Sequence, residues 1–159
     1  MDEFWLMLLL LTANGSPIVA RRLLGNRLGH PLDGGRRLAD GHRILGDSKT
    51  WRGLAAAVLA STLLTLAIGW PWQAGVTIGL AAMLGDSLSS FVKRRLGMAS
   101  SSPAPGLDHI PESFFPLMAC KALLQLSWTQ VVLLSLGFMV ADLLLSRLLH
   151  QIGLRRHPY

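Results

Sequence analysis

Long apolar stretches separated by polar loops dominate the pattern of the chain. They cover residues 4–20, 54–68, 74–96, 113–126 and 129–149. A helix of about 20 apolar residues crosses the hydrocarbon core of a bilayer, and the longest stretches reach this length. The pattern therefore predicts an all-α, polytopic membrane protein with about five transmembrane helices, folded as a single domain over residues 1–159.

Three of the stretches carry features that affect their helices. The first includes Asn14 to Pro17, an Asn-Gly-Ser-Pro sequence that predicts a turn at the inner end of the span. The second reaches spanning length only with the tryptophans at its flanks. The fourth is short and contains Pro116 and Lys121, so its helix is the hardest to place.

Composition agrees with a membrane protein, and the positions of the cations predict its orientation. Hydrophobic residues make up 51% of the chain and charged residues 15%, with a mean hydropathy of +0.43 and a net charge of +6. Most cations fall in the first loop, the third loop and the tail with Arg155 and Arg156. The positive-inside rule places these regions in the cytoplasm, with the C-terminus, and the N-terminus outside. The cytoplasmic loops are then about residues 21–52 and 97–111, and the basic charge indicates topology rather than a nucleic-acid partner.

One acid lies at membrane depth. At 3.6 residues per turn, Asp86, Ser90 and Lys93 share a helix face, so an acid, a hydroxyl and a cation form a polar stripe. An ionisable residue inside a membrane helix is costly and indicates a functional site, with a cation or a bound metal as its compensation. The alternative, a helix whose Lys93 to Arg95 merely reach the membrane surface, leaves Asp86 unexplained.

The first loop repeats a theme of acids, glycines and arginines. It contains Leu32-Asp33-Gly34-Gly35-Arg36-Arg37 and then Asp40-Gly41 through Asp47-Ser48-Lys49-Thr50. Glycines allow close approach of the backbone to a ligand, and Arg and Lys donate to phosphate. A P-loop is excluded, because Asp47 stands where that motif needs lysine. The alternative is a polybasic loop held on anionic lipid, which does not require interleaved Gly-Asp pairs.

The third loop brings a second acid towards the membrane. Pro103, Pro105 and Gly106 predict a stiff turn that returns Asp108 and His109 to the membrane surface, where Asp108 would face Asp86. Two carboxylates beside a phosphate-binding surface suit Mg²⁺, which leaves its other positions to phosphate and water. Asp108 as a cap of the fourth helix is an equal alternative. We expect His109 to be an interfacial side chain rather than a metal ligand.

The remaining buried polar positions are expected to be structural. Lys121 and Asp142 are predicted to pair across the fourth and fifth helices, or Lys121 to reach the outer surface. Cys120, the single cysteine, lies in an apolar run and is expected in the core.

Several motifs occur together in order between residues 13 and 108. They are Ala13-Asn14 with Pro17, Leu32-Asp33 through Asp40-Gly41, Arg43 through Gly53, Leu84-Gly85-Asp86, Ser90 through Gly97, and Pro103 through Asp108. In this combination the chain resembles the CDP-archaeol synthase family, membrane cytidylyltransferases related more distantly to phosphatidate cytidylyltransferase (CDP-diacylglycerol synthase). One departure concerns the acid that the family commonly has three residues after Asp108, where this chain has Pro111 followed by Glu112.

The resemblance implies a nucleotidyltransferase that transfers the cytidylyl group of CTP to a phospholipid acid, with release of pyrophosphate. Its partners would be CTP, the lipid acid and the bilayer, and its cofactor Mg²⁺; the active site would face the cytoplasm at the cell membrane. The resemblance leaves open whether the lipid is phosphatidate or an ether-lipid phosphate, and whether the protein is a homodimer. The resemblance implies that the catalytic residues are Asp86, Lys93 and Asp108. It implies that Asp86 and Asp108 are metal ligands, with Glu112 as a shifted third ligand. The residues implied to bind the nucleotide or its phosphates are Arg43, Asp47, Lys49, Thr50, Arg52, Ser90 and Arg94, with Asp33 as a further candidate.

Two other classes of function are compatible with parts of the pattern. A small ion transporter would use buried charges such as Asp86 and Asp142, but would not need the Gly-Arg-Asp loop. A non-catalytic adaptor on anionic lipid would use that loop, but would not need acids inside the membrane.

Overall fold

The computed structural model describes residues 3–100, 102, 104 and 106–151, and this part of the chain is helical, as predicted. Its helices are α1 (Glu3–Leu24), α2 (Trp51–Ala67), α3 (Trp72–Arg95), α4 (His109–Cys120) and α5 (Trp128–Gln151). The described residues contain no strand beyond two isolated bridges, Pro31 with Thr50 and Arg37 with Arg43. The predicted residues Pro103, Pro105, Arg155 and Arg156 lie outside the described part.

Within the part of the chain that the structure describes, three helices are long and apolar enough to cross a membrane: α1, α3 and α5. The α2 helix is apolar but shorter, with 17 residues. The chain is therefore an all-α membrane protein, as the pattern of apolar stretches predicts. The number of spans and their orientation stay predictions.

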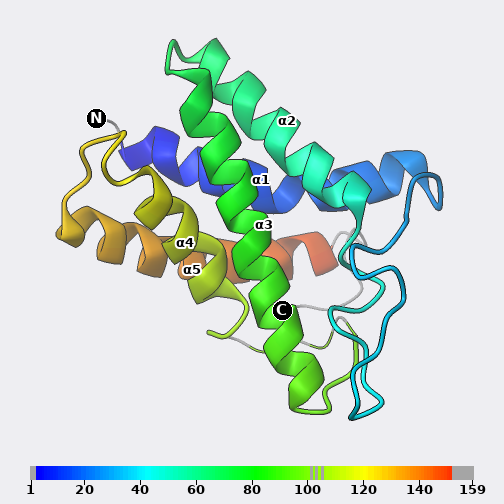
Figure 1. Cartoon of the computed structure of the whole chain (residues 1–159). Coiled ribbons are helices and arrows are strands. Elements are labelled where there is room, and N and C mark those ends of the chain that lie inside the picture. The colour runs from blue at the N-terminus through cyan, green and yellow to red at the C-terminus, as the bar shows by residue number, and fades with distance from the viewer. Residues whose placement is uncertain (1–2, 101, 103, 105, 152–159) are drawn as a thin grey trace.

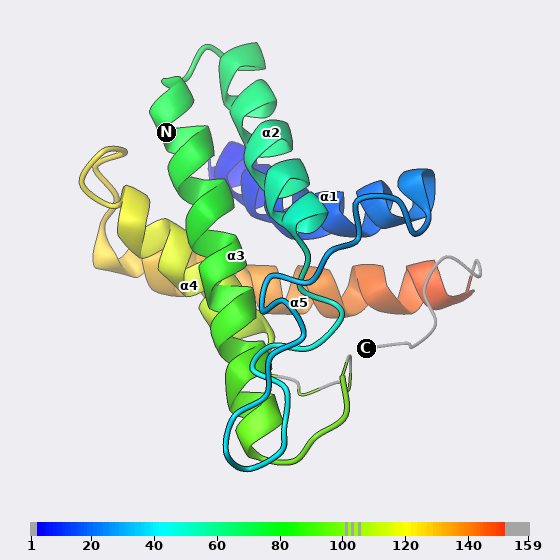
Figure 2. The ribbon, with the colours of Figure 1, turned by 45° about the vertical axis from the view of Figure 1, so that its right-hand side comes forward.

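The α3 helix is the centre of the arrangement. It packs against α2 on one side and α4 on the other, while α1 and α5 cross behind it at a steep angle (Figures 1 and 2). The first loop lies beside the C-terminal half of α3 (Figure 1). This half of α3 is therefore the place where the predicted functional loop meets the membrane helices.

Small residues allow α2 and α3 to lie close together. A Cβ added at Gly75 would lie 2.5 Å from the Cα of Thr62, and one at Gly79 would lie 2.7 Å from the Cα of Val58. Close backbone approach of this kind is how membrane helices gain packing energy, because lipid supplies no hydrophobic driving force between them.

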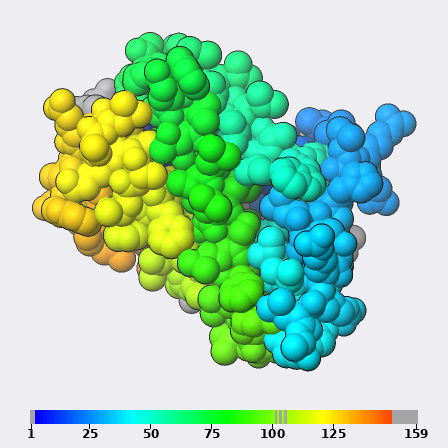
Figure 3. All heavy atoms as spheres, viewed as in Figure 1, coloured from blue at the N-terminus to red at the C-terminus, as the bar shows by residue number. Residues whose placement is uncertain are grey.

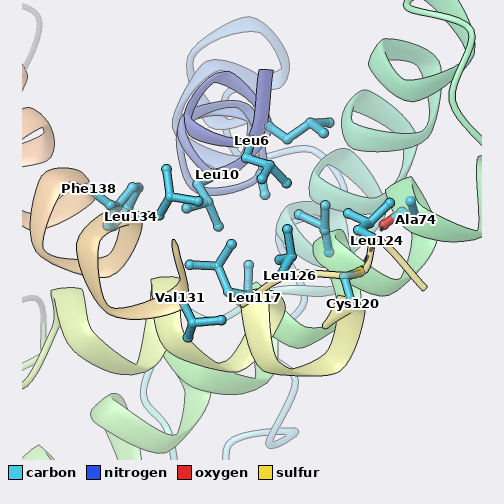
Figure 4. Packing of buried hydrophobic residues seen from close by; sticks show 14 of the residues in the cluster. Leu6, Leu10, Ala74, Leu117, Cys120, Leu124, Leu126, Val131, Leu134 and Phe138 are labelled. Atoms are coloured by element: carbon cyan, nitrogen blue, oxygen red, sulfur yellow. Dashed lines mark hydrogen bonds between the residues drawn. The ribbon is translucent and has the colours of Figure 1, made fainter. Parts of the chain in front are cut away.

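The apolar core joins α1, α4 and α5 and also includes residues of α2 and α3. Figure 4 shows Leu6 and Leu10 of α1 facing Leu117 of α4 and Phe138 of α5, all at most 1% exposed. Cys120 is fully buried in the same cluster, which confirms its predicted place in the core.

The predicted turn at Asn14 to Pro17 is wrong, because α1 continues through these residues to Leu24. Proline at position 17 cannot donate to the carbonyl of Ala13, but the hydroxyl of Ser16 lies 3.4 Å from that oxygen and donates to it. The amide of Asn14 donates to Leu10 O at 2.9 Å. Polar side chains thus replace what the proline removes, and the helix is not broken.

The fourth helix starts and ends earlier than the predicted residues 113–126. It begins at His109, so Pro111 lies in its first turn, where a missing N–H costs no helical hydrogen bond. It ends at Cys120, and Gln125 has a left-handed φ of 52° in the turn that follows. With 12 residues, α4 is about 18 Å long at 1.5 Å per residue, so that it is shorter than the membrane core.

Candidate active site

Asp86 and Lys49 form an ion pair on the side of α3 that faces the first loop. Lys49 Nζ lies 2.5 Å from Asp86 Oδ1, and the two side chains are only 16% and 20% exposed. Lys49 immediately precedes Thr50, whose hydroxyl accepts from Gly53 N–H at 3.1 Å and caps α2. The start of α2 therefore directs this lysine towards the membrane acid. The sequence predicts both residues for the site but not their contact.

Glu112 lies beside Asp86. The two carboxyl groups are hydrogen-bonding neighbours, although one comes from the middle of α3 and the other from the first turn of α4. Asn14 of α1 approaches the same place, with its amide 3.4 Å from the carbonyl of Glu112. Helix packing therefore brings together two acids that are 26 residues apart in the sequence.

Lys93 connects Asp108 to this acid pair. Its ammonium group lies 2.6 Å from Asp108 Oδ1 and donates to Ser102 O at 3.0 Å, and it also interacts electrostatically with Asp86. Asp108 precedes α4, but its side chain makes no capping bond. It accepts instead from the backbone N–H of Ala104 at 2.9 Å. The alternative of Asp108 as a helix cap is therefore not what the structure shows.

The first loop is built around Asp33. This buried carboxylate forms an ion pair with Arg43 at 2.7 Å and accepts from the backbone N–H groups of Gly35, Leu45 and Gly46, each at 3.0 Å. Burial by itself would raise the pKa of Asp33, but Arg43 and the N–H groups stabilise the anion, so the pKa lies well below its ordinary value. Asp33 thus holds the loop together.

Three residues predicted to bind phosphate are engaged with the loop itself. Arg43 also binds the exposed carboxylate of Asp47 at 2.7 Å. Arg52 donates to the carbonyls of Gly25 and Arg27, both at 2.7 Å. These contacts shape the loop, so that the assignment of Arg43, Asp47 and Arg52 to phosphate stays a prediction.

Residues at the C-terminal end of α3 bind both the first and the third loop. Arg94 is buried and donates to Ala99 O of the third loop at 2.5 Å, while Arg95 pairs with Asp40 at 2.5 Å and donates to Arg43 O at 2.6 Å. Ser90, one turn earlier, is 4% exposed. The sequence indicates Arg95 only as part of a basic cluster, and its role in docking the first loop comes from the fold.

A second polar contact joins α4 to α5. His109 is 6% exposed, and its Nε2 lies 3.3 Å from Asp142 Oδ2. The prediction of an interfacial His109 is therefore wrong, because the early start of α4 turns this residue into the protein. The predicted pair of Lys121 with Asp142 is also wrong, since Lys121 lies at the other end of α4 with its ammonium 5.1 Å from the ring centre of Trp128.

The elements around Lys49 and Asp86 enclose a small cavity. It is lined by residues of α1, the first loop, α2 and α3, among them Pro17, Ser48, Gly53 and Ser87. Figure 3 shows the first loop covering one flank of α3, with α4 on the other flank. Four segments therefore line this cavity, and Glu112 of α4 lies beside Asp86 in addition.

The acids of this site fit a hard divalent cation. Among the described residues no group of three or more His, Cys, Asp or Glu side chains has metal-binding geometry. Mg²⁺ does not need one, because it is commonly held by one or two carboxylates and completes its six positions with water and phosphate oxygens. The adjacent carboxyl groups of Asp86 and Glu112 provide such a pair.

The chain is similar throughout to proteins of archaeal lipid biosynthesis. A family model described as CarS-like CDP-archaeol synthase matches residues 1–159. The CDP-archaeol synthase of Methanopyrus kandleri is 40% identical over 131 residues, which cover 79% of this chain and 75% of the relative. That of Hyperthermus butylicus is 41% identical over 106 residues, which cover 63% of this chain and 60% of the relative. A solved structure of an intramembrane enzyme for archaeal membrane lipid biosynthesis superposes with a TM-score of 0.71 at 36% identity, over 87% of this chain and 89% of that chain.

Proposed function

Because the chain belongs to the CDP-archaeol synthase family and is thus a membrane cytidylyltransferase, we propose that it transfers the cytidylyl group of CTP to an ether-linked archaeal lipid phosphate in preference to phosphatidate. The products are a CDP-activated lipid and pyrophosphate. The observation that carries the proposal is the buried meeting of Asp86, Glu112 and Lys49 where the first loop joins α3.

The reaction is an in-line displacement at phosphorus. An oxygen of the lipid phosphate forms a bond to the α-phosphorus of CTP, and the bond from that phosphorus to the bridging oxygen of pyrophosphate breaks. The attacking oxygen is already anionic, so no general base is needed. The main obstacle is the repulsion between negative charges, which the site must offset by positioning and electrostatic stabilisation.

The two lysines suit this task. Lys49 and Lys93 each hold a carboxylate, Asp86 and Asp108 respectively, at the side of α3 where the loops converge. We expect Lys49 to turn towards the triphosphate when CTP binds, and Lys93 towards the leaving pyrophosphate or the lipid phosphate. Arg52 and Arg94 are proposed as further phosphate contacts, and Ser90 as a polar neighbour of Lys93.

Asp86 and Glu112, with Asp108 beside Lys93, are the residues that would hold a divalent cation, proposed to be Mg²⁺. Such a cation neutralises phosphate charge and orients the triphosphate when bound. The isoprenoid tails would remain in the bilayer and the reacting phosphates at its cytoplasmic face, as the distribution of cations in the loops favours. One chain is proposed to form the catalytic unit.

Pyrophosphate release by purified protein tests the proposal. With Mg²⁺, CTP and an ether-linked isoprenoid lipid phosphate we expect release that exceeds the rate with phosphatidic acid, and Asp86→Asn should abolish it because one ligand charge is lost. Glu3→Gln is the control, because Glu3 is exposed at the start of α1, where its carboxylate accepts from the side-chain amide of Gln130. An absence of CTP-dependent release with both lipids would contradict the proposal, and faster turnover of phosphatidic acid would contradict the lipid preference.

A further inference from the structure

Gly85 lies where the backbones of α3 and α4 meet. A Cβ added at this position would overlap the carbonyl group of Pro111, with its carbon 2.5 Å away, and would lie 3.0 Å from the backbone nitrogen of Glu112. These are main-chain atoms, so no side-chain movement can relieve the overlap. Any larger residue at position 85 must push α3 and α4 apart.

The residues that follow these two contact points are the acids of the site. Asp86 comes directly after Gly85, and Glu112 comes directly after Pro111. Their carboxyl groups are hydrogen-bonding neighbours. The main-chain contact therefore sets the distance between the two carboxyl groups.

Ser89 secures the same interface one turn further along α3. It is 1% exposed, and its hydroxyl lies 2.7 Å from Leu107 O and 3.0 Å from Gly85 O, so that it can donate to either carbonyl. Leu107 belongs to the segment that leads into α4. The hydroxyl thus holds the start of α4 against α3 at the level of the acids.

The other glycines of α3 that meet neighbouring main chain serve a different interface. Added Cβ atoms at Gly75 and Gly79 would meet Thr62 and Val58 of α2, not α4. Gly75 is ten residues from Gly85, or about 15 Å along the helix. It therefore offers a control with a similar overlap but no contact with the acids.

We propose that Gly85 and Ser89 are positioning residues that set the separation of the Asp86 and Glu112 carboxyl groups and thereby the affinity of the site for a divalent cation. This inference rests on the proposed function, in which these acids hold the cation. Residues that orient metal ligands change metal affinity by about 10- to 100-fold when they are replaced. Two acids held in contact favour a shared cation, whereas two acids moved apart lose it.

Binding of Mn²⁺, followed by electron paramagnetic resonance on purified full-length protein without nucleotide, tests the inference. Gly85→Ala should weaken Mn²⁺ binding by about 10- to 100-fold, whereas Gly75→Ala should bind within about twofold of the wild type because the two sites are remote from each other. Thermal unfolding of both variants measures the loss of stability that they share. The Mg²⁺ concentration for half-maximal pyrophosphate release should rise only in Gly85→Ala.

Ser89→Ala provides a second test that does not depend on the folding of Gly85→Ala. It keeps the space at residue 85 and removes the bond to Leu107, so it should weaken Mn²⁺ binding by about tenfold. Unchanged Mn²⁺ binding in Gly85→Ala or in Ser89→Ala, equal weakening in Gly75→Ala, or no saturable Mn²⁺ binding by the wild type would each overturn the inference. Failure of the proposed function looks different, since the wild type would then bind Mn²⁺ but release no pyrophosphate.

Discussion

Lysines and arginines around the site have different partners, although the sequence presents them as one basic population. Lys49 pairs with Asp86, and Lys93 pairs with Asp108. Arg43 and Arg95 each bind two or more oxygen-bearing groups of the first loop. The planar fork of arginine with its five donors suits several oxygens at once, whereas the lysine ammonium acts as a compact charge. The phosphates of a bound substrate would therefore lie near the lysines, which stand beside the acids. The arginines, in contrast, are already bound to groups of the first loop.

Asp33 gives the first prediction at this scale. Asp33→Asn should make opening of the first loop easier by about 1–3 kcal/mol, because buried donors then lose their charged acceptor. Amide hydrogen exchange at Leu45 and Gly46, whose N–H groups bind Asp33, measures the effect. Asp47→Asn is the control, since its pair with Arg43 is exposed and should contribute less than about 1 kcal/mol. Equal exchange in the two variants would show that Asp33 does not hold the loop.

The same carboxylate predicts how the loop responds to acid. The folded-state pKa of Asp33 is lowered, so its stabilisation is fully present above the ordinary value of about 3.9 and is lost as the pH falls through the lower, folded-state value. Protection at Leu45 and Gly46, corrected for intrinsic exchange, should hold from neutral pH to about pH 4 and decline below it. A decline of this protection centred near pH 6 would show that a titratable group other than Asp33 stabilises the loop.

At the scale of elements, α3 carries two interfaces and the site lies between them. Gly75 and Gly79 allow the backbone of α2 to pack closely against α3, and Gly85 allows the same for α4. Main-chain contact on both sides leaves the polar stripe little freedom to move. The predicted stripe of Asp86, Ser90 and Lys93 therefore lies on a helix that is held rigidly on both sides, and we expect conformational changes on substrate binding to occur in the side chains of the loops.

The link between α3 and the segment before α4 yields a prediction about the pair of Lys93 and Asp108. Lys93→Met should lower stability by about 2–3 kcal/mol, because it leaves Asp108 without its charged donor. Adding Asp108→Asn should restore part of the thermal stability without restoring pyrophosphate release, since both groups are proposed to act in the reaction. Thermal unfolding and turnover of the single and double variants separate the two effects. Equal stability of the single and double variants would show that the pair does not stabilise the fold.

At the scale of the whole molecule, the loops with the most charge gather at one end of α3. Figure 2 shows the first loop alongside the C-terminal half of that helix, while the connection between α2 and α3 lies at its other end. The cations are concentrated in the former and missing from the latter, at residues 68–71. A membrane crossed by α3 would thus have the site near its cationic side, which the positive-inside rule predicts to be cytoplasmic.

Thiol labelling tests this orientation. The single native cysteine, Cys120, is fully buried, so one introduced cysteine gives a clean signal. In intact cells a membrane-impermeant maleimide should label Gln73→Cys and should label Asn26→Cys only after the membrane is opened. Both residues are exposed, and the positive-inside rule predicts that the first loop, which holds Asn26, and the start of α3, which holds Gln73, lie on opposite sides of the membrane. Labelling of Asn26→Cys in intact cells would reverse the predicted topology.

The sequence was sufficient for the order of the helices, the membrane class and the family, and the comparisons confirm the predicted cytidylyltransferase. It was insufficient at three places where a side chain or a neighbouring helix changes the outcome. Ser16 compensates for Pro17 in α1, Pro111 fits the first turn of α4, and His109 is consequently buried against Asp142. Each depends on a contact that hydropathy and residue preference do not contain.

Apolar length, charge distribution and motif order follow from local residue chemistry, and for that reason the sequence by itself determined that this is a helical membrane enzyme, and it predicted a functional role for Asp86. Only the tertiary structure decided which groups face Asp86. Glu112 and Lys49 reach it from different segments, because glycines let the backbones touch and because Asp33 and Arg95 hold the first loop in place. Such distances arise from packing between remote parts of the chain, and no periodicity along the sequence encodes them.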